Sequence, residues 1–487
     1  GESLTRIFGI DKYKEKKKSD KDLFLIKKVE IHNMGFNMKN HRSEKIPFRG
    51  GIDWNDLDVK NININALDLS FKAGIMSGVV DKVSFVEKSG WVCNSISGEA
   101  KVGNGKTIVS NMRIQDKWSD IALPVFMMSY KNAKEFIDFN NLIKIDAEIS
   151  PSSLDFRTLH YLAPQLSNNR LKTRVSGKMS GYVSDFKVED INIAVKEGGF
   201  SSRLDGRITG LPEVEGLRID AKLSKTLVTA EGMGDFISAW MREGELDLSE
   251  YARGVMFSLN GYAKGPLNNL RTHISLSSMV GSASASLKVK QILNTAKPLN
   301  ISGSVSTNNL DVNSIIKNNL LRHTTAKAGF DAKFGRTLTV PDITLDSLVI
   351  DRLALNGYEY SGIKADGFYN SEAFEGMVIS NDPNMSFFLN AAQSKQDSLT
   401  NYSITADIAR ADLYAMNIDD RGTSEVSMIA EAEFSVSEGK HINGYAQIKN
   451  LILENDDDIY NIGDISLTSD QKDKDYKMKL VAPFADI

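Results

Sequence analysis

The stretch IDAEISPSSL, residues 145–154, carries an apolar residue at every second position before it breaks into a polar loop that ends on leucine. Side chains alternate between the two faces of a β-strand, so Ile145, Ala147 and Ile149 would all point to one side. The stretch therefore predicts a strand with a single apolar face.

Four later stretches repeat this pattern, each with an apolar residue nine places after its first residue. They are IDAKLSKTLV from residue 219, ISGSVSTNNL from 301, ITADIARADL from 404 and INGYAQIKNL from 442. The centre of the apolar face is small every time, because it is occupied by Ala147, Ala221, Gly303, Ala406 or Gly444. The starts are unevenly spaced, so the strand repeats without the fixed period of a propeller blade or a solenoid coil.

The composition is that of an ordinary globular protein. Of the 487 residues, 41% are hydrophobic and 25% are charged, and 63 acidic against 59 basic residues give a formal net charge of −4. The one basic run lacks the interleaved aromatic residues of a nucleic-acid site, so we expect no nucleic-acid partner. The single cysteine, Cys93, cannot form an internal disulfide, which fits a reducing compartment or an envelope protein without disulfides.

The ends and the linkers carry few signals. Residues 11–22 are almost wholly charged, so we expect residues 1–22 to be a charged linker or an exposed helix, followed by one continuous region, 23–487. The longest apolar stretch, residues 121–128, contains Pro124 and is far shorter than the roughly 20 residues of a membrane-spanning helix. Because the chain opens on Gly1 without an export signal, we expect it to be a fragment of a longer protein.

Short turns separate the alternating runs. Turn-forming residues occur at 104–105, 197–199, 382–384 and 455–456, which favours antiparallel hairpins joined in order. The run 61–71 slips in phase at Ala66, which predicts a bulge. Helical spacing is confined to residues 152–162, 233–242 and 311–321, and Ser152 and Asp311 could cap the first turns of two of these helices.

The motifs of catalytic and metal sites are missing from the sequence. VGNGKT at 102–107 has Ala100 where a phosphate-binding loop needs its first glycine, and Asn104-Gly105 fits a two-residue hairpin turn. The six histidines lie at no ligand spacing, and Asp456, Asp457 and Asp458 lack the pattern of a calcium loop. We therefore expect neither an enzyme nor a bound metal or cofactor.

An array of one-sided strands must bury its apolar face by packing a second sheet on it, by adding helices, or by curling around something apolar. The predicted helices are too few to cover it, and aromatic residues, at 8%, are scarce for a chain of separately packed cores. We therefore expect a mainly β fold: an elongated, curled antiparallel β-sheet, a half-pipe with an apolar interior, with a few short helices in the connections.

The small central residues allow two interpretations. At any single position, a glycine or alanine is usually accommodated by a large neighbour on the next strand. Alternatively, the repeated loss of bulk leaves room for acyl chains, which need no directional polar contacts. The residues expected to line such a lipid-binding groove are Ile62, Ile64, Leu67, Leu69, Ile145, Ala147, Ile149, Ile219, Ala221, Leu223, Ile301, Gly303, Val305, Ile404, Ala406 and Ile408.

Four stretches, residues 52–71, 81–102, 146–164 and 175–193, resemble the TamB branch of the AsmA-like family of diderm bacteria. The likeness is strongest over residues 25–280 and continues to the end through the repeated strand pattern. It implies a periplasmic protein, anchored in the inner membrane in its full-length form, that passes phospholipids between the inner and outer membranes through its groove. The chain shows neither the N-terminal membrane helix nor the C-terminal module of full-length relatives.

Two other functions remain open from the sequence. The family has also been linked to the assembly or export of outer-membrane proteins with a barrel partner, in which an exposed sheet edge would pair with client strands. A plain structural spacer is the third possibility. The partners expected are therefore phospholipid acyl chains, the inner membrane through an anchor outside this chain and, for the alternative function, an outer-membrane barrel protein.

Overall fold

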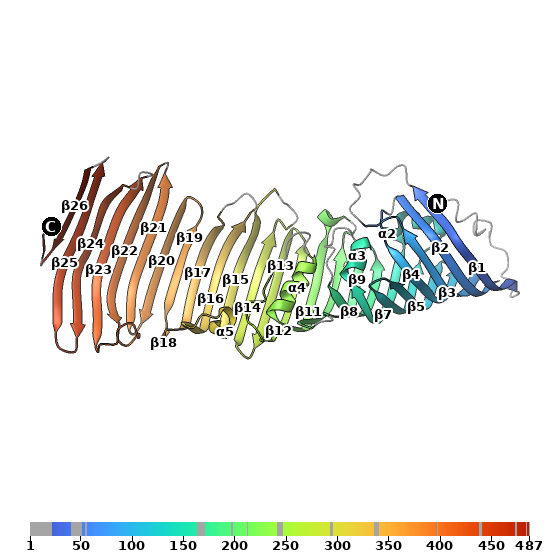
Figure 1. The fold of residues 1–487 in the computed structure, drawn as a ribbon, viewed down its shortest axis with the longest axis horizontal. Coiled ribbons are helices and arrows are strands. Elements are labelled where there is room, and N and C mark those ends of the chain that lie inside the picture. Colours follow the sequence, from blue (N-terminus) through green and yellow to red (C-terminus); the bar gives the residue numbers. More distant parts are fainter. Residues whose placement is uncertain are drawn as a thin grey trace. The chain divides into compact units, whose positions relative to one another are not determined.

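The computed structural model describes residues 22–39, 51–53, 56–162, 171–195, 198–211, 213–240, 247–292, 296–335, 340–396, 398–437, 441–472, 475–483 and 485–486. The expected charged linker, residues 1–22, lies outside them except for Asp22. The described residues are mainly β: they form long antiparallel strands and a few short helices, as expected (Figure 1).

The chain divides into two compact units, Gly1–Pro266 and Leu267–Ile487. Within each unit, strands that follow one another along the chain lie side by side, and all described pairings are antiparallel (Figure 1). The single continuous region expected for residues 23–487 stays a prediction.

The first unit contributes the strands β1 to β12, and within the unit each strand pairs with the next. They are β1 (Asp22–Lys39), β2 (Asp56–Lys72), β3 (Ile75–Glu87), β4 (Val92–Gly103), β5 (Lys106–Asp116), β6 (Asp120–Ser129), β7 (Lys144–Asp155), β8 (Lys172–Tyr182), β9 (Asp185–Val195), β10 (Phe200–Thr209), β11 (Arg218–Val228) and β12 (Phe257–Pro266). The first three repeated stretches from the sequence fall on β7, β11 and, in the second unit, β15.

The second unit contributes β13 to β27, again paired in chain order, except that β17 pairs with both β18 and β19. They are β13 (Asn269–Ser278), β14 (Gly281–Lys290), β15 (Leu299–Asp311), β16 (Leu321–Phe334), β17 (Asp342–Leu355), β18 (Tyr358–Tyr360), β19 (Ile363–Tyr369), β20 (Ala373–Asp382), β21 (Met385–Gln396), β22 (Leu399–Asp412), β23 (Ser424–Ser437), β24 (Ile442–Asn455), β25 (Ile459–Lys472), β26 (Asp475–Ala482) and β27 (Ala485–Asp486). The two remaining repeats form β22 and β24, so all five are strands.

The helices are short and lie in connections. They are η2 (Ala133–Asp138), α2 (Phe139–Leu142), α3 (Phe156–Leu162), η3 (Val214–Gly216), α4 (Ala230–Trp240) and α5 (Val312–Ile316). Three of them overlap the helices that the sequence predicts. The prediction that Ser152 caps α3 is wrong, because β7 continues to Asp155 and the Ser152 hydroxyl donates to the Ser150 carbonyl, 2.7 Å away. At α5, the Asp311 carboxylate accepts from the Ser314 hydroxyl rather than from a backbone N–H.

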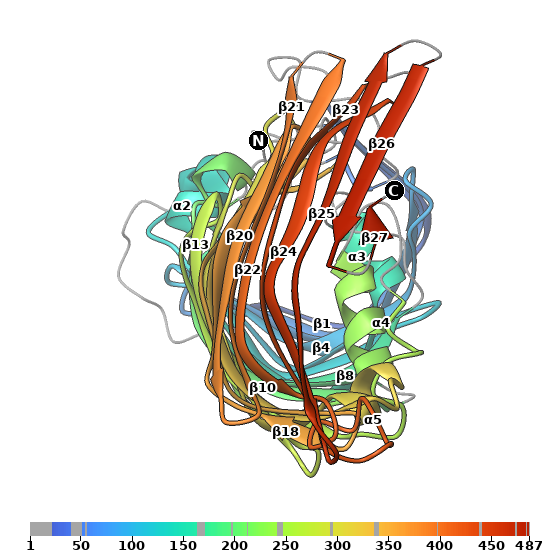
Figure 2. The same cartoon turned by 90° about the vertical axis from the view of Figure 1, so that its left-hand side faces the viewer.

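The strands of both units bend along their length rather than lying flat (Figure 2). In the first unit, β5, β7, β9 and β11 each carry one residue more than the even-numbered strand paired with them at the point where the register shifts. On three of them a residue with a left-handed backbone marks the bulge, namely Asn111, Asp190 or Lys225, with φ of 52°, 53° and 51°. Because a bulge bends its strand and increases its twist, this row of bulges accounts for the curvature.

The phase slip that the sequence predicts at Ala66 lies two residues further along β2. The register between β2 and β3 does shift between Asn65 and Ala66, but the extra residue there is on β3. The bulge of β2 falls between Leu67 and Ser70, where Asp68 has a φ of 48°.

Each unit is built as one layer of sheet, and its apolar residues are accordingly only partly buried. The principal helix contacts are those of α2 with β8, α3 with β7, α4 with β10 and α5 with β16. Compact cores form at the margins of the sheets, for example around Met416, which is fully buried among Tyr360, Ala411 and their neighbours.

Candidate functional site

One face of the first unit carries an uninterrupted row of residues without polar side chains. The row follows directly paired residues from β4 to β12, one per strand. Its members are Ala100, Val109, Phe126, Ala147, Met179, Val188, Gly206, Ala221 and Ala263. Because directly opposed residues in an antiparallel sheet point to the same side, these side chains form one apolar band across the strands.

The second unit carries a longer row of the same kind. It crosses β13 to β25, with β18 left out, and again every member is apolar. The residues are Ile274, Ala285, Val305, Ala328, Leu348, Ala365, Val378, Leu389, Ala406, Ala430, Ile448 and Ile465. No charge or hydroxyl interrupts the band within this unit.

The opposite face of the first unit is polar from β7 to β12. The neighbouring row, one residue along each strand, consists there of Asp146, Ser180, Lys187, Arg207, Asp220 and Lys264, whereas on β5 and β6 it continues through the apolar Ile108 and Met127. Its charges are paired: Lys264 Nζ lies 2.9 Å from Asp220 Oδ2, and the hydrogen bond from Arg207 lowers the pKa of Asp185. In the second unit the corresponding row mixes serine and lysine with Val349, Ile379 and Phe388, so the two faces differ less there.

The apolar face of the first unit is the side that α4 covers. Phe236 of α4 stacks on Phe200 of β10, with ring centroids 4.0 Å apart. Phe200 shares its side of β10 with Gly206 of the apolar row, because the two are separated by an even number of residues. In Figure 2, α4 lies on the inner side of the bend of these strands. The apolar band therefore lies on the concave side of the first unit.

The sixteen residues predicted to line a groove fall on five strands. Ala147 and Ala221 belong to the apolar row of the first unit, and Val305 and Ala406 to that of the second. Gly303 and Ile404 share the adjacent row of the second unit, which also contains Phe330 and Ala391. The others lie on the same strands: Ile62, Ile64, Leu67, Leu69, Ile145, Ile149, Ile219, Leu223, Ile301 and Ile408.

Leu67 lies in a different kind of row from the rest. It is paired with Lys28 and with Val79, and Val79 is paired with Glu99, so charged residues flank it across the sheet. The bulge falls at Asp68, after Leu67, and returns Leu69 to the apolar side, where its Cδ2 lies over Gly78. The sequence pattern predicts the change of phase at Ala66, before Leu67, and therefore assigns Leu67 to the apolar side. The bulge lies after Leu67, so this side chain faces the opposite side.

The small centres of the repeats have different surroundings. Ala147 is opposed by Phe126 and Met179 and is only 9% exposed, so large neighbours fill its space. Ala221 is opposed by Gly206 and Ala263, so three small residues lie side by side. Large neighbours thus replace the missing bulk at Ala147, whereas Ala221 lies between small neighbours and is partly exposed.

The two glycine centres are small for a third reason, which is the close approach of a neighbouring backbone. A Cβ on Gly303 would lie 2.0 Å from the Ser286 carbonyl oxygen, and one on Gly444 would lie 2.1 Å from that of Glu433. Both glycines also have a positive φ, 147° and 148°, that other residues rarely adopt. Glycine is required here by the geometry of the strand itself.

Most members of both rows are not among the groove residues that the sequence predicts. In β14, for instance, the run SASASLKVK alternates clearly and brings Ala285 into the row, but its small residues gave it a weak apolar signal. The rows become visible only when the register is known, because each strand contributes one residue.

Polar groups at the margins have structural partners. The carboxylate of Asp382, 2% exposed, accepts hydrogen bonds from the Tyr358 hydroxyl at 2.6 Å and from the Ser361 and Asn384 amides at 2.8 and 2.9 Å. Burial alone would raise the pKa of Asp382, but these hydrogen bonds together outweigh it and lower the pKa. This carboxylate anchors the β17–β18 hairpin against the start of β21.

The reactive groups of the described residues form no cluster that indicates chemistry. No three His, Cys, Asp or Glu side chains in this part of the chain gather as metal ligands would. The thiol of Cys93 is buried, and this burial raises its pKa to about 11. The glycine-rich stretch at 102–107 forms the predicted hairpin turn between β4 and β5, with Asn104 and Gly105 at φ of 51° and 73°.

Comparisons with known proteins and a search for membrane-spanning helices assign no family or function to the chain. The chain matches no known protein family, no curated protein and no solved structure among those compared. Within the described ranges, no helix has the length and apolar character needed to cross a membrane.

Proposed function

We propose that the protein carries phospholipids along its apolar rows, with the acyl chains against the sheet and the headgroups in water. The observation that carries this proposal is the pair of uninterrupted apolar rows, nine residues in the first unit and twelve in the second, on single-layered sheets. Side chains in these rows remain partly exposed, as Ala221, Val305 and Ala406 do. Covering them with hydrocarbon contributes about 0.8 kcal/mol for each buried methylene.

Acyl chains fit this surface better than a polypeptide does. A peptide laid on the face of a sheet would leave its backbone N–H and C=O groups without partners, at a cost of about 1–3 kcal/mol for each group. The rows offer no side-chain donors or acceptors to compensate. A hydrocarbon chain has no such groups, so many lipids would bind without selection among them.

The resemblance to the TamB branch of the AsmA-like family supports the setting of the proposal. It implies a full-length protein in the periplasm, anchored in the inner membrane, that transfers lipid between the inner and outer membranes. On this proposal no residue of the rows acts as a catalyst. Their shared role is to keep acyl chains away from water.

Site-specific photo-crosslinking in cells tests the proposal with matched neighbours. A photo-reactive residue at Ala221 or Ala406 should capture phospholipid, because both lie in apolar rows. One at Asp220 or Asp407, the adjacent residues on the other face, should not. Equal lipid labelling at all four positions, or none at any, would contradict the proposal.

One observation favours the alternative, a scaffold for the assembly of outer-membrane proteins. Strand β1 is the first of the described strands and exposes Phe24, Leu25 and Ile26, at 43%, 54% and 44%. A strand of a client protein could pair with such an edge. A crosslinker at Leu25 that captured unfolded outer-membrane protein, with no lipid captured at Ala221 or Ala406, would support the scaffold instead.

A further inference from the structure

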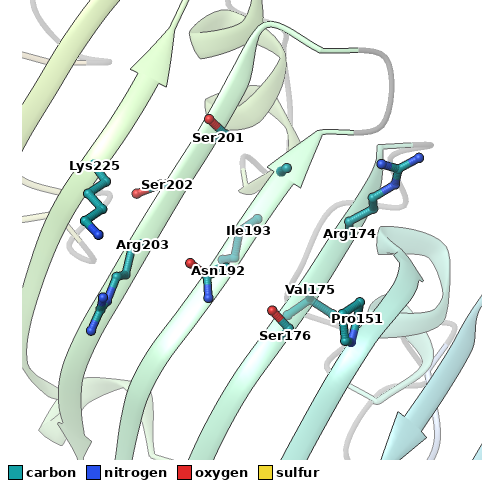
Figure 3. Close-up of a pocket in the computed structure, with 11 residues that line it drawn as sticks. Pro151, Arg174, Val175, Ser176, Asn192, Ile193, Ser201, Ser202, Arg203 and Lys225 are labelled. Atoms are coloured by element: carbon teal, nitrogen blue, oxygen red, sulfur yellow. The ribbon is translucent and has the colours of Figure 1, made fainter.

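A second feature of the first unit lies on its polar face, away from the apolar row. It is a depression of about 240 Å³ across β7 to β11 (Figure 3). Its charged lining consists of Arg174 on β8, Arg203 on β10 and Lys225 on β11, and no carboxylate is among its lining residues. In Figure 3, Arg203 and Lys225 extend in the same direction from adjacent strands.

The bulge in β11 places Lys225 beside Arg203. Arg203 pairs with Ser224 and Ser201 pairs with Leu227, so β11 contains an extra residue at this point. Thr226 takes the buried side, where its hydroxyl lies 2.8 Å from that of Ser202. Lys225 is exposed, and with a φ of 51° its backbone is left-handed. The extra residue thereby adds a cation to the polar face without disturbing the other face.

Arg203 keeps N–H groups without a hydrogen-bond partner among the described residues. Its Nη2 donates to Asp190, whereas its Nε lies 3.8 Å from the Asp205 carboxylate, too far for a hydrogen bond, and is buried and unsatisfied. The Asn192 amide, also in the lining, donates to the Asp190 carbonyl at 2.9 Å. The Nη1 of Arg203 donates to none of the described residues, so it is open to an acceptor in the depression.

The charges nearby leave an excess of positive charge. The lining contains three cations, Arg174, Arg203 and Lys225, and the two carboxylates beside it, Asp190 and Asp205, both lie against Arg203. Within the part of the chain that the structure describes, neither Arg174 nor Lys225 forms an ion pair. Guanidinium and ammonium groups together are the usual protein ligands of phosphate oxygens.

We propose that this depression binds a phosphate group, held by the Nη1 of Arg203 and by the ammonium group of Lys225. The volume suffices for one such oxyanion. The site is on the opposite face from the apolar row. The headgroup of a lipid bound to the apolar row therefore cannot reach the phosphate site through the sheet. The phosphate comes either from free inorganic phosphate or from a phospholipid headgroup at a membrane surface.

Titration calorimetry with inorganic phosphate at low ionic strength tests the site. Binding should have a Kd on the order of 1 mM, typical of a few charge-assisted hydrogen bonds. Lys225→Gln, which breaks no ion pair of the described residues, should weaken it roughly 10-fold, as loss of one such bond implies. Arg203→Gln should do the same, provided that its circular dichroism matches the parent protein.

Lys264→Gln provides the matched control, because it removes one positive charge from the same face at a residue paired with Asp220. It should change the phosphate affinity less than about 2-fold, because Lys264 does not line the depression and acts on the phosphate only through its long-range charge. Absence of phosphate binding up to about 10 mM would overturn the proposal. An equal loss in Lys264→Gln and Lys225→Gln would also overturn it, because it would reflect overall charge alone.

Vesicles identify the source of the phosphate. Binding to phosphatidylcholine vesicles that contain phosphatidic acid, lost in Lys225→Gln, would support the site with a lipid headgroup as its ligand. Phosphate binding without vesicle binding would support it with the free anion. Vesicle binding without phosphate binding would overturn it as a surface-charge effect. Lipid capture at Ala221 should be unchanged in Lys225→Gln, so the phosphate site and the acyl face stand or fall separately.

Discussion

The repeats centred on Ala147 and Ala221 look alike in sequence but differ in the space around them. Both alanines lie in the same apolar row of the first unit. Phe126 and Met179 flank Ala147 and bury it, whereas Gly206 and Ala263 flank Ala221 and leave it partly exposed. A small residue on a strand therefore creates room only where its two cross-strand neighbours are also small.

The difference assigns separate roles to the two positions. Around Ala147, side chains of the protein itself fill the space and bury the alanine. The region around Gly206, Ala221 and Ala263 presents three small, adjacent residues on the same face. Three pairs of substitutions test these two roles and the separate explanation for the glycine centres.

The largest effect is expected from aspartate at the two alanines. Ala147→Asp should destabilise the protein by about 3 kcal/mol, because the carboxylate would be held between Phe126 and Met179 away from water. Ala221→Asp should cost less than about 1 kcal/mol, since its small neighbours leave the charge a path to solvent. Urea denaturation of both variants measures the difference.

The lipid readout separates folding from function in this pair. Ala221→Asp should keep the fold and abolish phospholipid capture at neighbouring positions of the row. If Ala221→Asp unfolds the protein as readily as Ala147→Asp does, Ala221 is part of a closed core. The difference in packing between Ala147 and Ala221 would then be contradicted.

Alanine at two glycines tests whether strand geometry, rather than space for a ligand, requires the glycine centres. Gly303→Ala should cost about 2 kcal/mol, because the new Cβ would collide with the Ser286 carbonyl at a positive φ. Gly376, which lies in the same row, has only the Asp366 carbonyl near its Cβ position, at 3.8 Å. Gly376→Ala should be stabilising by about 0.5 kcal/mol. Equal thermal midpoints in the two variants would exclude the backbone explanation.

Phenylalanine at the two alanines gives the smallest stability difference. Ala147→Phe should cost about 1–2 kcal/mol through overpacking against Phe126 and Met179. Ala221→Phe should leave the stability within about 0.5 kcal/mol, because the ring would lie on an open surface. The amount of phospholipid that co-purifies should fall with Ala221→Phe and stay unchanged with a mild Ala147→Val substitution. The reverse order of stabilities would show that the two surroundings have been misassigned.

The fold class could be predicted from the sequence because strand alternation is a local property. All five repeats are strands, and the turn at residues 104–105 is where its Asn-Gly pair indicates. The space at each repeat could not be predicted, because Phe126 and Gly206 are brought beside Ala147 and Ala221 only by the register. Ser152 was misread as a helix cap for a related reason: its hydroxyl accepts from the Ala122 amide, 2.9 Å away on β6.

The candidate sites divide in the same way. Alternation identified residues such as Val305 and Ala406 as members of an apolar face, whereas the length and continuity of the rows depend on pairings that no single strand contains. The phosphate site depends on the bulge at Lys225. A lysine with a left-handed backbone gives no signal in the sequence, because asparagine, aspartate and glycine are the residues usually expected there.

The placement of bulges on alternate strands sets how such a chain can change in length. In the first unit, β5, β7, β9 and β11 carry the extra residue and the strands between them do not, so the smallest repeating element is a pair of strands. Duplicating or deleting one pair keeps the curvature and the sidedness of everything that follows. A single-residue insertion within a strand would instead transfer all later side chains of that strand to the wrong face. Evolution can therefore adjust the span of such a sheet in discrete steps, without redesigning its cross-section.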